Sequence, residues 1–233
     1  MGLANAAILG REFRLAREMQ SQSLSQDLIL VVRDISYGDI LSGKVPPHQV
    51  LRAQVSEWIM RPARQLANLR IVDARDTDHG IALLSLLMLF FEPHGQYLSG
   101  KDSKSISEQT FTLALLRLLG WLHDNDLLTL EPSAINPSDF YKLARCGLLH
   151  SAQLKGGFLV DSLCMRNEAI YQHKQFASGY LINPWQLLEG LERYFEDYIL
   201  AISDNSHSDY ASLRKPFELS YQRLVLDVLS SYA

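Results

Sequence analysis

Cysteine is scarce in this chain of 233 residues, which contains only Cys146 and Cys164. Two cysteines are too few for the disulfide framework that stabilises many small secreted domains, so the sequence predicts a reducing, cytoplasmic location. We expect both thiols to be reduced and unpaired.

An excess of charge of one sign is also missing. Lys and Arg total 22 and Asp and Glu total 26, for a formal net charge of −4. This balance excludes a protein-wide basic field, so any contact with RNA or DNA must come from a local patch. Hydrophobic residues make up 47% of the chain and charged residues 21%, which favours a packed core over disorder.

A long uninterrupted apolar run is absent as well. The strongest run, Ile81–Phe91, ends at Glu92-Pro93 and is far shorter than the roughly 20 residues that a bilayer span requires. It therefore predicts a buried core helix and no membrane span. The N-terminal region shows no signal-peptide pattern, because Arg11, Arg14 and Arg17 follow its apolar stretch instead of preceding it.

Helical periodicity dominates what is present. Residues 49–69 predict a helix that Pro62 kinks or splits, and residues 78–98 predict a helix around the apolar run. The next helix is predicted to begin at a capping box, Ser105-Ile106-Ser107-Glu108, whose serine and glutamate side chains would satisfy free backbone amides reciprocally. Its inward stripe has i, i+3, i+4 spacing and consists of Phe111, Ala114, Leu115, Leu118 and Leu122.

Two Asn-Pro pairs mark further helix starts, because asparagine caps free amides and proline suits the first helical position. Asn136-Pro137 precedes an inward stripe of Phe140, Leu143, Ala144 and Leu148. Asn183-Pro184 precedes a long amphipathic helix marked by Leu187, Leu188, Leu191, Phe195, Tyr198 and Ile202.

Strand signals are sparse, and only Leu28–Val32 and Phe158–Val160 have them. The sequence does not decide whether these two segments pair. We predict an all-α bundle of about six to eight helices with one small hairpin at most. In this prediction a single domain has its core at about 49–204, an N-terminal extension at 1–48 and a C-terminal helix within 209–233, starting near Leu213 after a polar loop.

One glycine-containing segment resembles a phosphate-binding loop. Gly38–Lys44 fits G-x-x-x-x-G-K and follows an apolar run. That motif needs a Ser or Thr next for Mg²⁺ and a helix N-terminus directed at the phosphates. Val45 occupies the hydroxyl position, and Pro46-Pro47 delays any helix. The segment therefore favours an ordinary turn over a nucleotide site.

A metal site is an alternative interpretation of residues near position 150. Cys146 and His150 are four residues apart, which places them on one helical face, and Cys164 could supply a third zinc ligand. No second paired spacing and no H-E-x-x-H motif is present in the sequence. We therefore expect no metal or other cofactor and keep zinc as the more distant alternative.

The strongest functional signal is Arg145-Cys146-Gly147-Leu148-Leu149-His150 with its flanks, from Phe140 to Phe158. Over this stretch the chain resembles proteins of the HEPN-domain superfamily, which carry R-x(4–6)-H near the start of a helix in a helical bundle. Arg145 and His150 fit that motif, with four residues between them. The resemblance is strong over these 19 residues only, and the rest of the helical pattern is merely compatible with it.

The resemblance implies a homodimer in which two such motifs face each other, and in many members a metal-independent endoribonuclease. Other members are non-catalytic modules that bind RNA or a protein. By analogy, the setting would be toxin–antitoxin or phage defence, with an antitoxin or regulatory protein as a further partner.

The chemistry of the two residues agrees with this expectation. Histidine titrates near neutral pH and can transfer a proton from a ribose 2′-OH or to the leaving oxygen, and arginine can hold the phosphate as charge develops. Attack by the 2′-OH would leave a 2′,3′-cyclic phosphate. Residues five apart on an α-helix point about 140° apart, so either Gly147 loosens the helix or a dimer partner completes the site. Glu92, at the end of the apolar run, could line the same cleft.

Overall fold

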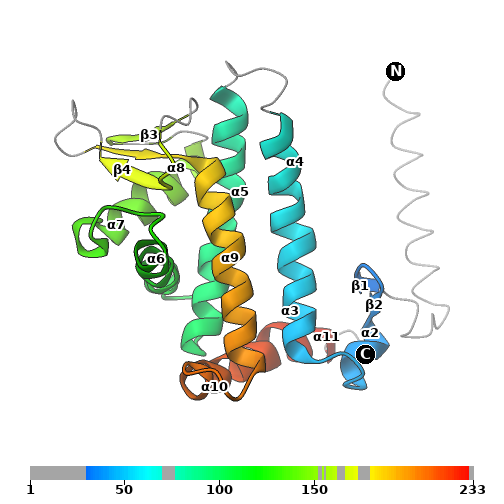
Figure 1. The fold of residues 1–233 in the computed structure, drawn as a ribbon. Helices are drawn as coiled ribbons and strands as arrows, with labels where there is room; N and C mark the ends of the chain where they lie inside the picture. Colours follow the sequence, from blue (N-terminus) through cyan, green and yellow to red (C-terminus); the bar gives the residue numbers. More distant parts are fainter. Residues whose placement is uncertain are drawn as a thin grey trace, which may run out of the picture. The chain divides into compact units, whose positions relative to one another are not determined.

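The computed structural model describes residues 30–69, 77–151, 154, 156–161, 166–172 and 179–230. The chain divides into two compact units, of which the first ends at Val50 and the second begins at Leu51. Helices predominate, and small sheets accompany them (Figure 1). The prediction of a mainly helical chain is therefore confirmed, although the described residues hold more strand than the sequence indicated.

In the first unit, β1 (Leu30–Val32) pairs antiparallel with β2 (Ile35–Ser36), and α2 (Tyr37–Leu41) follows directly. The strand predicted at 28–32 is confirmed from Leu30 onward, and its first two residues lie outside the described part. Helix α3 (Pro47–Val55) begins at the end of this unit.

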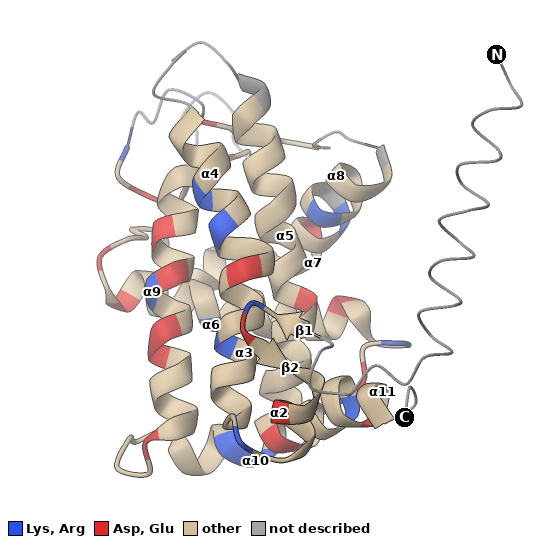
Figure 2. Cartoon of the chain, turned by 90° about the vertical axis from the view of Figure 1, so that its right-hand side faces the viewer, with Lys and Arg blue, Asp and Glu red and all other residues tan. Residues whose placement is uncertain are grey.

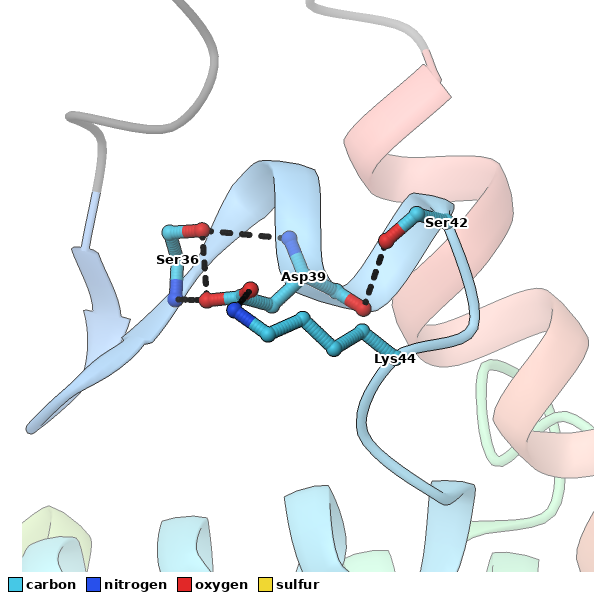
Figure 3. Close-up of polar contacts among 4 residues, drawn as sticks. All are labelled: Ser36, Asp39, Ser42 and Lys44. Atoms are coloured by element: carbon cyan, nitrogen blue, oxygen red, sulfur yellow. Dashed lines mark hydrogen bonds and ion pairs between the residues drawn. The ribbon is translucent and has the colours of Figure 1, made fainter.

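A capping box that the sequence interpretation missed starts α2 (Figure 3). The Ser36 hydroxyl accepts a hydrogen bond from the Asp39 amide at 3.1 Å, and the Asp39 carboxylate accepts one from the Ser36 amide at 3.1 Å. Lys44 Nζ lies 2.6 Å from the other Asp39 oxygen. The bonds from Lys44 and Ser36 lower the pKa of Asp39 to about 2. The lysine of the apparent phosphate loop thus has a carboxylate partner.

The expected turn over Gly38–Lys44 is only partly correct, because Gly38 lies inside α2. The chain turns later, at Ser42 and Gly43, where Gly43 has a φ of 70°. Glycine adopts this left-handed conformation without the steric cost that a side chain would impose.

Pro62 does not break its helix. Helix α3 continues through a π-helical segment (Ser56–Met60) into α4 (Arg61–Leu69), and the Arg61 amide donates to the Ser56 carbonyl. Proline lacks the N–H of an α-helical bond and its ring crowds the preceding turn, and a wider π turn accommodates both defects. The predicted kink therefore appears as a local widening.

Helix α5 (Thr77–Ser99) occupies the centre of the second unit, in contact with α4, α6, α9 and α10 (Figure 1). Its Leu83, Leu84, Leu87 and Phe91 are fully buried. Among the described helices, the stretch His79–Ser99 is the one long and apolar enough to cross a bilayer by length and composition, and 61% of its most apolar window is buried in the protein. The core helix predicted at 78–98 is confirmed.

Helix α6 (Ser107–Asp124) crosses α5 at very close range. A Cβ placed on Gly95 would lie 1.8 Å from the Thr110 carbonyl oxygen, so the two backbones touch at this crossing. The capping box predicted at 105–108 is wrong. The N-cap lies one residue later, at Ile106, which makes no side-chain capping bond, and Glu108 instead accepts a 2.6 Å hydrogen bond from Ser138. The stripe predicted for α6 is buried: Phe111, Ala114, Leu115, Leu118 and Leu122.

The Asn-Pro starts are both confirmed. Asn136 caps α7 (Pro137–Asp139) and Asn183 caps α9 (Pro184–Ser203), each by accepting backbone N–H bonds through its side chain. Basic residues of α4 and acidic residues of α9 lie side by side (Figure 2), and Arg64 pairs with Glu192 there.

The last helical stretch begins three residues before the predicted Leu213. It comprises α10 (Tyr210–Tyr221), a π-helical segment (Gln222–Leu226) and α11 (Asp227–Ser230), and α10 packs on α5 and α9.

A three-stranded sheet packs beside the segment that carries Arg145 and His150 (Figure 1). Its order is β3 (Phe158–Val160), β5 (Tyr180–Ile182), β4 (Ile170–Gln172), with β5 parallel to β3 and antiparallel to β4. The strand predicted at 158–160 is confirmed. It does not pair with the strand near residue 30, and the single small hairpin of the prediction is replaced by two separate sheets.

Candidate functional site

The segment from Pro137 to Ser151 is one continuous helical stretch with an irregular centre. After α7, residues Phe140–Arg145 form a π-helical turn, and α8 (Cys146–Ser151) follows. The Cys146 amide donates to the Tyr141 carbonyl, five residues back, which closes the wider ring. Single π turns of this kind are frequent at functional sites. This one ends at Arg145.

Packing from two directions fixes the π turn. The Phe140 ring meets the Phe158 ring of β3 edge to face, with centroids 4.6 Å apart. On the other side, the Tyr141 hydroxyl lies 2.9 Å from the Ser107 hydroxyl at the start of α6. Glu108 of α6 holds Ser138, and it also pairs with the exposed Lys142 at 3.6 Å. The segment is therefore anchored to both the sheet and α6.

Arg145 turns toward α5 and forms an ion pair with Glu92, whose Oε2 is 2.7 Å from the arginine Nη2. The two side chains are only 20% and 21% exposed. The Arg145 guanidinium also lies 5.4 Å from the centre of the Tyr141 ring and 3.9 Å from the Cys146 sulfur. Burial by itself would lower the pKa of Arg145, but Cys146 and Glu92 more than offset it and raise that pKa, so the side chain stays charged. Glu92, which the sequence suggested as a residue that could line the same cleft, thus lies beside Arg145.

A pocket of about 190 Å³ lies beside this ion pair. Arg145, Glu92 and Gln96 supply its polar groups, and Met88, Leu89, Pro93 and Leu149 line the remainder. Gln96 is 7% exposed, and its Oε1 has no hydrogen-bond partner among the described residues. A buried amide oxygen without a partner costs free energy and is available to a donor on a ligand.

His150 is exposed and does not line this pocket. One prediction was that Gly147 loosens the helix and lets His150 turn toward Arg145. The helix is regular from Cys146 to Ser151, so this loosening is not observed. At about 100° per residue in this α-helix, the two side chains leave the helix in directions roughly 140° apart. Within one chain the structure therefore brings Arg145 to Glu92 and leaves His150 facing outward.

The zinc alternative gains nothing from the described residues. Cys146 is a half-buried free thiol, and Cys164 lies outside the described part of the chain. No group of three or more His, Cys, Asp or Glu side chains suited to hold a metal occurs among the described residues.

Three contributors to the site were not identified from the sequence. Tyr141 lay inside the motif segment, but nothing marked it as a contact of the arginine. Gln96 follows Glu92 by four residues, which places it on the same face of α5, and that spacing was the available signal. Glu108 was assigned to helix capping, and its long-range role had no local signature.

No match was found among protein-family models, curated proteins or solved structures.

Proposed function

We propose that this protein is a homodimeric, metal-independent endoribonuclease of the HEPN type, with Arg145 and His150 as its catalytic residues. The observation that best supports this proposal is the placement of Arg145. A π turn and an ion pair with Glu92 hold its guanidinium at the wall of a pocket, while His150 projects from the next turn.

In the proposed reaction His150 removes the proton from a ribose 2′-OH. The oxygen then attacks the adjacent phosphorus, and the P–O5′ bond breaks as the leaving 5′ oxygen takes up a proton from water. The products are a 2′,3′-cyclic phosphate and a 5′-OH end, and His150 returns its proton to solvent. Arg145 holds the phosphate oxygens as negative charge builds. Its guanidinium has five N–H donors, so the bond to Glu92 leaves donors for a phosphate. Glu92 is a positioning residue in this scheme.

The proposed dimer supplies the proton-transfer group that one chain does not bring to the pocket. Leu89 and Leu149, which line the pocket, are 45% and 40% exposed and give this surface an apolar rim suited to a self-complementary interface. If each site takes its arginine from one chain and its histidine from the other, mixing Arg145→Ala and His150→Ala chains should restore activity. Half of the mixed dimers are then heterodimers with one intact site of two, so about a quarter of wild-type activity is expected.

The activity test uses RNA cleavage in excess EDTA, with product ends identified by mass spectrometry. Wild-type protein should produce 2′,3′-cyclic phosphate ends, and RNA lacking the attacking 2′-OH should resist cleavage. His150→Ala should lower the rate by about 10²–10⁴-fold, and Arg145→Ala by a comparable factor. His123→Ala and Arg193→Ala are matched controls at remote positions and should cleave normally. Full cleavage by His150→Ala would refute the proposed role of that residue.

A non-catalytic module that binds RNA or protein is the second candidate, and the charge pairing favours it. Arg145 pairs with Glu92 and Lys142 pairs with Glu108, so the two cations of this segment carry little free charge for RNA. A regulatory or antitoxin-like protein that covers Leu89 and Leu149 would then be the partner. In that case Leu149→Asp abolishes partner binding, while His150→Ala leaves it intact.

A further inference from the structure

A second pocket, about twice the volume of the one beside Arg145, lies between α6, α9 and the start of α10. Its volume is about 390 Å³, within the range of roughly 300–1,000 Å³ that is usual for small-molecule sites. Arg145 and His150 do not line it. Its polar lining includes Arg117 and Asp124 of α6, Asp197 of α9, and Asp209 just before α10.

The charge of this pocket is negative. One guanidinium faces three carboxylates, which leaves a net charge of −2 with His207 neutral. The guanidinium of Arg117 is already paired, because its Nη2 lies 2.6 Å from Asp209 Oδ2. An anionic ligand would meet two further carboxylates and no unpaired guanidinium, whereas a cation would be attracted. The described residues also contain no cluster of three or more metal-binding side chains, so the expected cation is organic.

Aromatic rings complete the lining. The Trp121 Nε1 donates to Asp197 Oδ2 at 2.8 Å, which orients the indole and holds this carboxylate at its edge. The Tyr194 ring lies 6.1 Å from the Trp121 ring at a steep angle. An indole beside a carboxylate is a favourable combination for an ammonium or guanidinium group, because the ring face and the carboxylate both attract positive charge.

Tyr198 is an independent sign of a missing ligand. It lines the pocket, it is 3% exposed, and its hydroxyl has no hydrogen-bond partner among the described residues. The neighbouring Tyr194 differs, since its hydroxyl lies 2.7 Å from His94 Nε2. A buried hydroxyl without a partner is destabilising unless something else bonds to it.

We propose that this pocket binds a small organic cation, an alkylammonium or guanidinium group, which stacks on Trp121, pairs with Asp124 and Asp197, and bonds to the Tyr198 hydroxyl. The cation is either a free polyamine or the basic side chain of a protein partner. Neither source depends on the ribonuclease chemistry proposed for Arg145 and His150.

Isothermal titration calorimetry of the full chain at low salt tests this site with three probes: spermidine, N-acetyl-argininamide and AMP. At least one of the two cations should bind with one site per chain. Binding of spermidine alone supports a free polyamine, and binding of N-acetyl-argininamide alone supports a peptide side chain. Heat from AMP alone, or from none of the three, would overturn the proposal.

Variants then assign the binding to this pocket. Asp124→Asn/Asp197→Asn should weaken binding by about tenfold or more, because both charge interactions are lost. Asparagine at 197 can still accept from Trp121, so the fold is retained. Asp34→Asn/Glu131→Gln removes the same number of charges elsewhere and should bind like the wild type.

Tyr198→Phe separates a ligand contact from a packing role. Removing an unpartnered buried hydroxyl should leave the unliganded protein equally stable or more stable in thermal denaturation. The same change should weaken cation binding by about three- to tenfold. Unchanged affinity in both Tyr198→Phe and the double asparagine variant would place the binding elsewhere and overturn the proposal.

Discussion

The ion pair between Arg145 and Glu92 can be measured by a double-mutant cycle. The variants are Glu92→Gln, Arg145→Met and the combination, each a change that keeps the approximate length of the side chain. The free energy of unfolding of all four proteins is obtained from urea denaturation, with the slope of each transition compared to verify that the unfolding reaction is the same. The coupling energy is the difference between the change in unfolding free energy of the double variant and the sum of the changes of the two single variants.

The expected coupling follows from the geometry. The charged atoms are 2.7 Å apart, and both side chains are about one-fifth exposed. Exposed ion pairs contribute about 0.2–1 kcal/mol, and hydrogen bonds to charged groups contribute about 1.5–3 kcal/mol. A partly buried, well-aligned pair should lie near the junction of these ranges, at about 1.5 kcal/mol. Each single variant should lose at least that amount, since each leaves one partner without its counter-charge.

The pair Arg193–Glu189 provides a matched control, because it lies on the exposed surface of α9 with side chains 59% and 42% exposed. Its coupling should be about 0.3–0.5 kcal/mol and should fall further in high salt. The Arg145–Glu92 coupling should fall less, because solvent ions reach it less easily. Equal couplings for the two pairs would refute the argument that Glu92 holds Arg145 in place.

Two further predictions concern stability. Gly95→Ala should destabilise the protein by about 3 kcal/mol or more, since its Cβ would meet the Thr110 carbonyl oxygen at 1.8 Å. Gly120→Ala on α6 has open space around its Cβ and should be neutral or stabilising by up to about 1 kcal/mol in the same urea titration. Burial, with a smaller effect of Arg117, lowers the pKa of His94 to about 3, so the folded protein binds the proton less well than the unfolded chain does. The contribution of neutral His94 to the free energy of unfolding is therefore complete above its unfolded pKa of about 6.5. It is lost as pH falls toward 3. Denaturation of wild type and His94→Gln at pH 4.5 and 7 should show the smaller pH dependence in the variant.

Local signals in the sequence predicted the helices well. Asn136-Pro137 and Asn183-Pro184 carry their capping information within three residues, and the structure begins helices at both. The stripe of α6 is buried as its spacing predicted. By contrast, Ser105–Glu108 has the letters of a capping box, yet Glu108 bonds to Ser138 of a helix 30 positions away. A short motif cannot show which of two competing partners a carboxylate takes.

The short strands escaped detection for a related reason. Ile170–Gln172 and Tyr180–Ile182 have three residues each, too few for an alternating pattern to emerge. The equally short Phe158–Val160 differs because the glycine pair Gly156-Gly157 precedes it as a turn signal. Their stability comes from pairing, since β5 joins β3 and β4 in one sheet. Phe158 was predicted as a strand residue from its local sequence. Its packing against Phe140 is a tertiary contact, which the local sequence does not indicate.

The candidate site combines both kinds of information. The resemblance of the segment to a known family motif indicated Arg145 and His150, and the position of Glu92 at the end of the apolar run made it a candidate for the same cleft. The π turn over Phe140–Arg145 depends instead on anchors from α6 and β3.

Because a π turn uses more residues per turn than an α-helix does, it changes the direction in which every later side chain leaves the helix. In an unbroken α-helix from Pro137, the Arg145 side chain would leave the helix in a different direction. It could then pair with Glu92 only if the whole helix were rotated about its axis. The arginine is thus placed by tertiary contacts upstream of it, and any substitution that restores regular α-helical geometry at 140–145 should separate Arg145 from Glu92 without touching either residue.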